Sequence, residues 1–133
     1  MSKEENPNDI PSPDEDKSAR KIVKIQIEAM AENNEPYEDA GIETAFNFAS
    51  PENKASTGPI DRFKKMVKNP RYRQMLNSNS YRIQETDIGE KQGLIRAELE
   101  NEDSIVTYEF NVGIQESGEY EGCWMTDSVL RID

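Results

Sequence analysis

Apolar residues recur at two different spacings along this chain, and the spacing changes near residue 79. Over residues 19–30 they fall three and four positions apart, which places them on one side of a helix. Over residues 106–114 apolar and polar residues alternate, which is typical of a half-buried strand. This order predicts an α+β domain in which about three N-terminal helices pack on a curved, four-stranded, mostly antiparallel sheet.

Prolines mark the predicted helix starts. The segment 12–15, Ser-Pro-Asp-Glu, indicates a capping box at the start of a first helix that runs to about residue 34. Further helices are predicted over residues 41–49 and from Pro59, with a turn over residues 50–53 between them. The predicted buried stripe of the first helix consists of Ala19, Ile22, Val23, Gln26, Ala29 and Met30.

Four predicted strands follow, over about residues 81–86, 93–99, 106–114 and 120–132. The last has apolar residues on both faces. Trp124, Leu130 and Ile132 share one face, and Cys123, Met125 and Val129 share the other. This pattern predicts a central strand covered on both sides, with a second subunit as a possible second cover.

The chain length suits one domain. Residues 1–11 combine acids and prolines with few apolar residues, which predicts a disordered acidic tail. Residues 12–133 are then expected to form a single folded domain. No targeting segment or long apolar run is evident, and Cys123 is the only cysteine, so we expect a cytoplasmic protein.

The formal net charge is −11, from 27 acidic and 16 basic residues, and the chain contains no histidine. Such a surface repels phosphates and anionic lipids, so neither nucleic acid nor a membrane is an expected partner. The acidity fits an ordinary acidic protein or one adapted to high salt, and the composition leaves both open. Without thiol pairs or imidazoles, neither a metal site nor a cofactor is expected.

Several local motifs resemble one known superfamily. Residues 46–53 (Phe-Asn-Phe-Ala-Ser-Pro-Glu-Asn) precede the helix start at 57–59 (Thr-Gly-Pro), and Gly122-Cys123-Trp124 lies in the last predicted strand. Phe63, Met66, Val67 and Tyr72 follow the Gly-Pro start. Together they resemble an uncharacterised family of the nuclear transport factor 2-like, or cystatin-like cone, superfamily, in versions from halophilic archaea.

The resemblance implies a cone-shaped fold with a pocket between the sheet and the first helix. The superfamily includes isomerases and dehydratases as well as non-catalytic transport and assembly modules, so the fold does not select a function. Many of its enzymes use a pocket histidine, which this chain lacks. The pocket residues expected from the cone are Tyr108, Phe110, Trp124 and Met30.

The candidate catalytic group is Asp127, which lies mid-strand among apolar neighbours, with Tyr37, Tyr81 or Tyr108 as proton donor. A general acid would need a shifted pKa inside the cavity. The alternative interpretation of Asp127 is an ordinary hydrogen-bonded edge carboxylate, and the pocket aromatics equally suit a filled core.

A basic segment stands out in this acidic chain. No acidic residue interrupts the run from Arg62 to Gln84. It suits an acidic protein partner or a small anion, or else a solvated helix face whose charges neighbouring carboxylates balance. The candidate patch consists of Arg62, Lys64, Lys65, Lys68, Arg71 and Arg73.

The sequence therefore favours a non-catalytic binding or assembly module, with a homodimer through the sheet face as a possible assembly. The alternative is a small-molecule pocket protein or an isomerase- or dehydratase-like enzyme that uses a pocket carboxyl and a tyrosine.

Overall fold

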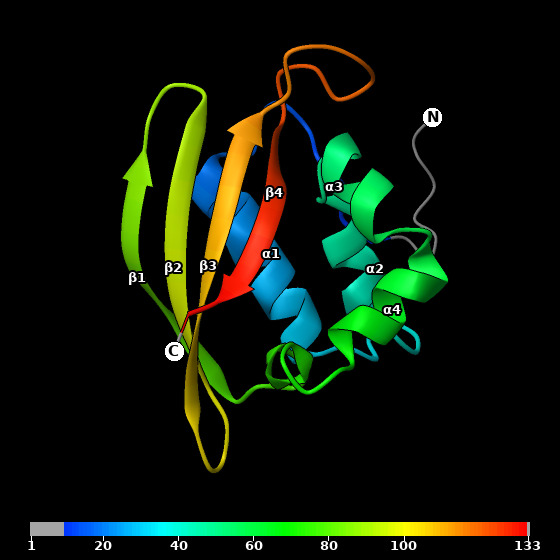
Figure 1. Ribbon diagram of the computed structural model, residues 1–133, viewed down its shortest axis with the longest axis vertical. Coiled ribbons are helices and arrows are strands. Elements are labelled where there is room, and N and C mark those ends of the chain that lie inside the picture. Colours follow the sequence, from blue (N-terminus) through cyan, green and yellow to red (C-terminus); the bar gives the residue numbers. More distant parts are fainter. Residues whose placement is uncertain (1–9, 133) are drawn as a thin grey trace.

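The computed structural model describes residues 10–132. In this part of the chain four α-helices and a short 3₁₀ turn precede four strands (Figure 1). The helices are α1 (Ala19–Ala31), α2 (Ala40–Asn47), α3 (Pro51–Thr57) and α4 (Ile60–Val67), followed by the 3₁₀ turn η1 (Arg73–Met75). The strands are β1 (Ser80–Ile88), β2 (Gln92–Glu100), β3 (Ile105–Ile114) and β4 (Trp124–Arg131).

The four strands form one antiparallel sheet in the order β1-β2-β3-β4, so each strand pairs with the next along the chain. The predicted α+β class, with helices before an antiparallel four-stranded sheet, is confirmed. The sheet is not strongly curled (Figure 1). Most of the predicted tail, residues 1–9, lies outside the described residues.

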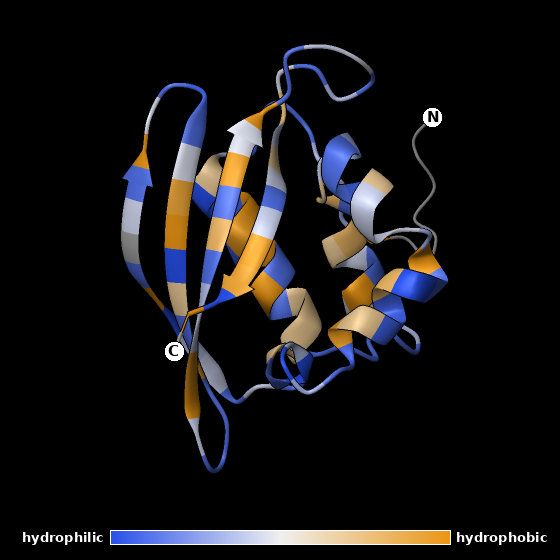
Figure 2. Ribbon diagram, viewed as in Figure 1, coloured by the Kyte–Doolittle hydropathy of each residue, from blue (hydrophilic) through white to orange (hydrophobic). Residues whose placement is uncertain are grey.

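Helix α1 crosses one face of the sheet and contacts all four strands, while α2, α3 and α4 gather beside the β4 edge (Figure 1). Apolar residues alternate with polar ones along the strands, and α1 presents its apolar side to the sheet (Figure 2). The core therefore lies between α1 and the face of the sheet that α1 covers. Its fully buried members include Ile22, Val23, Ile27, Ile95, Ala97, Leu99, Tyr108 and Phe110.

The predicted capping box at residues 12–15 is wrong, because α1 begins six residues later. Ser18 has an extended backbone, and its hydroxyl accepts a hydrogen bond from the Lys21 amide at 3.1 Å. Before it, the Asp14 carboxylate accepts hydrogen bonds from the Asp16 amide and from Lys17, which holds a turn. Both serines suit a cap by type, but only Ser18 adjoins the first buried residue of the stripe.

The turn predicted over residues 50–53 is also wrong, because α3 begins there. The Ser50 hydroxyl accepts from the Asn53 amide at 3.2 Å, and Pro51 takes the first helical position. The sequence signal for a helix start was present. The segment nevertheless predicts a turn, because α3 has no buried residue and thus no apolar periodicity.

The predicted central position of the last strand is wrong, because β4 lies at the sheet edge. The ladder between β3 and β4 slips between Asn111 and Val112, so Asp127 is an extra residue, as in a β-bulge. The bulge changes which residues face the core. Met125 is fully buried and Cys123 is 5% exposed, so neither lies on an open face for a partner.

Close packing of α2 on α1 makes Gly41 the most demanding glycine of the fold. A Cβ built there would lie 2.2 Å from the Ala29 carbonyl oxygen. We expect Gly41→Ala to lower the free energy of unfolding by about 3 kcal/mol, because the two helices must separate. Gly89→Ala is the matched control, since its Cβ would meet only the Gln92 carbonyl oxygen at 3.4 Å. Urea denaturation of both variants measures the difference, and equal stabilities would contradict this packing.

Candidate functional site

A cavity of about 490 Å³ lies where α1, α2, α3 and α4 meet the edge strand β4. Its size suits a small organic molecule. Glu52, Ser56 and Asp127 are exposed lining residues and mark its rim. The buried part of the lining consists of Gln26, Met30, Ala45, Ala49, Phe63, Val67, Met75, Phe110 and Thr126.

Two polar side chains interrupt this apolar lining. Gln26 of α1 and Thr126 of β4 are each 2% exposed. The Gln26 Nε2 atom donates to Thr126 Oγ1 at 2.8 Å and to the Ile22 carbonyl oxygen at 3.1 Å. These two side chains, which we call the Gln26–Thr126 pair, are the neutral polar groups in the buried part of the described lining.

The backbone of Thr126 holds the pair in place. Its amide donates to the Phe48 carbonyl oxygen at 2.7 Å, and its carbonyl accepts from the Ser50 amide at 2.8 Å. The Asn53 side chain donates to the same carbonyl at 3.1 Å. The α2–α3 connection thus pairs with β4 through an isolated parallel bridge between Ala49 and Thr126, which fixes one wall of the cavity.

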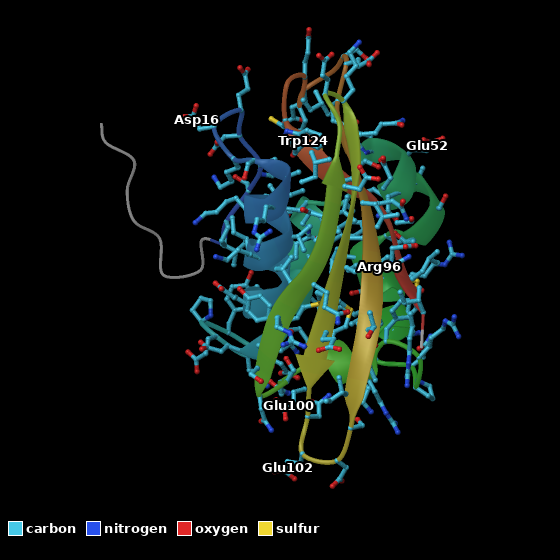
Figure 3. The ribbon with its side chains drawn as sticks, turned by 90° about the vertical axis from the view of Figure 1, so that its left-hand side faces the viewer. Asp16, Glu52, Arg96, Glu100, Glu102 and Trp124 are labelled. Carbon is cyan, nitrogen blue, oxygen red and sulfur yellow. The ribbon has the colours of Figure 1, made fainter. Side chains whose placement is uncertain are left out.

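The four pocket residues expected from the cone lie in different places. Met30 and Phe110 line the cavity, whereas Tyr108 and Trp124 do not. Tyr108 is fully buried, and its hydroxyl donates to the Arg71 carbonyl oxygen at 2.8 Å. Trp124 lies at one end of the sheet, and the β2–β3 turn, marked by Glu102 in Figure 3, lies at the other end.

Sequence reasoning missed the Gln26–Thr126 pair. The sequence pattern places Gln26 in the buried stripe of α1, where a glutamine needs hydrogen-bonding partners, and this is the available signal. Thr126 carries no such signal, since threonine is an ordinary strand residue. The distance of 100 residues between them in the chain explains why only the fold reveals the pair.

Asp127, the candidate catalytic residue, is exposed at the rim. Its carboxylate lies beside Gly113, where a Cβ would come within 3.0 Å of Oδ2. The three candidate proton donors lie outside the cavity lining. Tyr37 donates to Glu43 at 2.6 Å, Tyr81 to Glu28 at 2.6 Å, and Tyr108 to a backbone carbonyl.

Neighbouring carboxylates further reduce the acidity of two of these phenols. The hydrogen bond to Glu43, followed by burial, raises the pKa of Tyr37 to about 12. Burial, followed by the hydrogen bond to Glu28, raises the pKa of Tyr81 to about 12. The structure therefore does not bring Asp127 together with any of the three candidate tyrosines in the lining of the cavity.

Part of the basic segment is paired within the protein. Lys64 Nζ lies 3.2 Å from Glu43, and Lys68 Nζ lies 2.8 Å from Asp39. The Arg71 guanidinium donates to the Arg131 carbonyl oxygen at 3.3 Å. The side chains of Arg62, Lys65 and Arg73 are exposed. The carboxylates of Glu43 in α2 and of Asp39 just before it thus balance two charges of the patch.

Three further observations concern metal ligands, membrane-spanning helices and the thiol of Cys123. No group of three or more acidic or cysteine side chains there is placed to hold a metal ion. Among the same residues, no helix is long and apolar enough to cross a bilayer. Burial, with nearby Glu15 and Asp14, raises the pKa of Cys123, which disfavours a reactive thiolate.

Residues 12–130 match the family model described as a domain of unknown function, DUF4864. The chain belongs to the DUF4864 family. The match spans the helices, the cavity and nearly the whole sheet, so the cavity lies inside the family domain. No curated protein matches the chain in a sequence search.

The Asp39–Lys68 pair predicts a pH dependence of stability. Burial acts to raise the pKa of Asp39, but the hydrogen bonds from Lys68 and Asn33 outweigh it and hold the pKa of this carboxyl below its ordinary value. The ionised Asp39 carboxylate therefore stabilises the fold. This stabilisation is fully present above about pH 4 and is lost as the pH falls through the folded-state pKa of Asp39.

We expect Asp39→Asn to lower the free energy of unfolding by about 1 kcal/mol near pH 6, because water screens the half-exposed Lys68. The difference from the unmodified protein should shrink near pH 3. Urea denaturation at both pH values measures it, with exposed Asp103→Asn as the control. A difference that does not change with pH would contradict this account.

Proposed function

We propose that this DUF4864 domain is a non-catalytic module that binds a small molecule in the cavity beside β4. The Gln26–Thr126 pair in the buried lining of a cavity of about 490 Å³ carries the proposal. Binding pockets combine an apolar lining with a few placed polar groups in this way. A residual core void would instead be expected to lack buried polar groups.

The ionisable groups favour binding over catalysis. The carboxylates of the lining, Glu52 and Asp127, are exposed at the rim, and the tyrosine of the lining, Tyr72, donates its hydroxyl to the Val129 carbonyl oxygen at 3.0 Å. A proton-transfer enzyme of the isomerase or dehydratase type requires an acid or base within reach of the bound substrate. We therefore favour a binding function over an isomerase- or dehydratase-like enzyme.

The nuclear transport factor 2-like resemblance remains a proposal for the ancestry of the fold. The order of elements, helices before an antiparallel sheet, and a pocket between α1 and the sheet support it. The sheet is less curled than the cone-shaped fold of that superfamily implies (Figure 1).

Filling the cavity should abolish binding. Ala45 is buried in the lining, whereas Ala55 on α3 is exposed and outside it. We expect Nile red, an uncharged dye, to gain fluorescence with the unmodified protein. Ala45→Leu should weaken this binding at least about tenfold, because the added methyl groups take up space in the cavity.

Ala55→Leu is the matched control and should bind Nile red as the unmodified protein does. Melting temperatures of both variants separate lost binding from lost folding. No fluorescence gain with the unmodified protein, or an equal loss in both variants, would overturn the proposal.

A second proposal, a homodimer through the outer sheet face, rests on a different observation. Ile105 is 57% exposed, Leu130 46% and Ile132 41%. Leu130 pairs with Glu109, and the Ile132 amide donates to the Thr107 carbonyl oxygen, so the three lie near one end of β3 and β4. Large exposed apolar side chains that gather in one place are typical of an interaction surface.

The dimer proposal predicts a concentration-dependent monomer–dimer equilibrium in sedimentation velocity. Changing both Ile105 and Ile132 to lysine should shift the protein fully to monomer, since the apolar surface is lost and charge is added. Ile88→Lys, at a 41% exposed residue of β1, is the control. An unmodified protein that stays monomeric at about millimolar concentration contradicts the dimer.

A further inference from the structure

The hydrogen bonds of the Gln26–Thr126 pair define which groups remain free to meet a ligand. The Ile22 carbonyl oxygen can only accept, so the Gln26 atom facing it is the amide nitrogen. That nitrogen has two hydrogens, and the second goes to Thr126 Oγ1. Turning the amide over would place two oxygens against each other. The Gln26 Oε1 atom is therefore left as an acceptor.

Thr126 completes the set with one donor. Its Oγ1 atom accepts from Gln26, and no described residue accepts its hydroxyl hydrogen in return. Its backbone amide and carbonyl are already used by the α2–α3 connection. The pair thus offers the cavity one acceptor, Gln26 Oε1, and one donor, the Thr126 hydroxyl.

The charges around the cavity disfavour an anion. No lysine or arginine is among the described lining residues, and its two carboxylates lie at the rim. An anionic group at the pair would keep one hydrogen bond and face the Gln26 oxygen. The loss of its hydration would be poorly compensated, because moving a charge into an apolar site is costly.

We propose, on the basis of the proposed binding function, that the ligand is an uncharged molecule with an apolar body and one terminal primary amide or alcohol. That end donates a hydrogen bond to Gln26 Oε1 and accepts one from the Thr126 hydroxyl. Its apolar body lies against the side chains of Met30, Phe63 and Phe110. Carboxylates and phosphates are excluded.

Three eight-to-nine-carbon probes of matched size test this class: octanamide, octanoate and the corresponding methyl ketone. Isothermal titration calorimetry near pH 7 gives the affinity of each for the full chain. Octanamide should bind at least about tenfold more tightly than octanoate, because a neutral end avoids the cost of burying charge. The ketone, which cannot donate, should bind about fivefold more weakly than the amide.

Two variants assign the preference to the pair. Gln26→Leu removes the acceptor, so the amide should lose its advantage over the ketone while the ketone still binds. Thr126→Ser keeps the hydroxyl and should retain the preference. Melting temperatures verify that both variants fold.

The outcomes separate the ligand class from the binding function. If octanoate binds as tightly as octanamide, or if Gln26→Leu leaves the amide preference intact, the proposed class is overturned and the binding function stands. If none of the three probes binds the unmodified protein and Nile red does not bind it either, both the binding function and the proposed ligand class are overturned.

Discussion

The structure depends on the hydrogen bonds made by Thr126. Its amide and carbonyl pair with the α2–α3 connection, and its hydroxyl accepts from Gln26 of α1. Helix α1 and the α2–α3 connection are therefore both joined to β4 at this one buried residue. Each such bond contributes only about 1 kcal/mol, but a broken one would leave a buried polar group unpaired, which costs more.

This joint also explains why a cavity exists. The pairing between Ala49 and Thr126 holds the α2–α3 connection beside the sheet edge, and α4 packs on α2 and α3. Phe63, Met66 and Val67 of α4 thus line one wall, opposite β4. The bulge at Asp127 turns its carboxylate out beside Gly113, so the cavity interior stays neutral.

The net charge of −11 hides several local pairs of opposite charge. Lys64 and Lys68 of the basic segment pair with the carboxylates of Glu43 and Asp39, so α4 is attached to α2 by opposite charges. On the sheet, Arg96 lies 3.2 Å from Glu109, and Figure 3 shows it midway along the strands. Opposite charges are thus paired locally although the chain as a whole is strongly acidic.

The sequence by itself determined the order of the elements and the core of α1 and β3. Burial of one face leaves a repeat of apolar residues in the chain, at helical spacing in α1 and at alternate positions in β3. Examples are Ile22 and Val23 of α1 and Phe110 and Val112 of β3. Helix α3 was missed because it buries none of its residues and leaves no such repeat.

Only the tertiary structure decided the cavity, the edge position of β4 and the burial of Met125. These depend on a bulge and on hydrogen bonds between residues far apart in the chain, such as Gln26 and Thr126. Their local sequence is ordinary. Pairing across 100 residues is set by how the helices and the sheet pack together, and local sequence preference does not encode it.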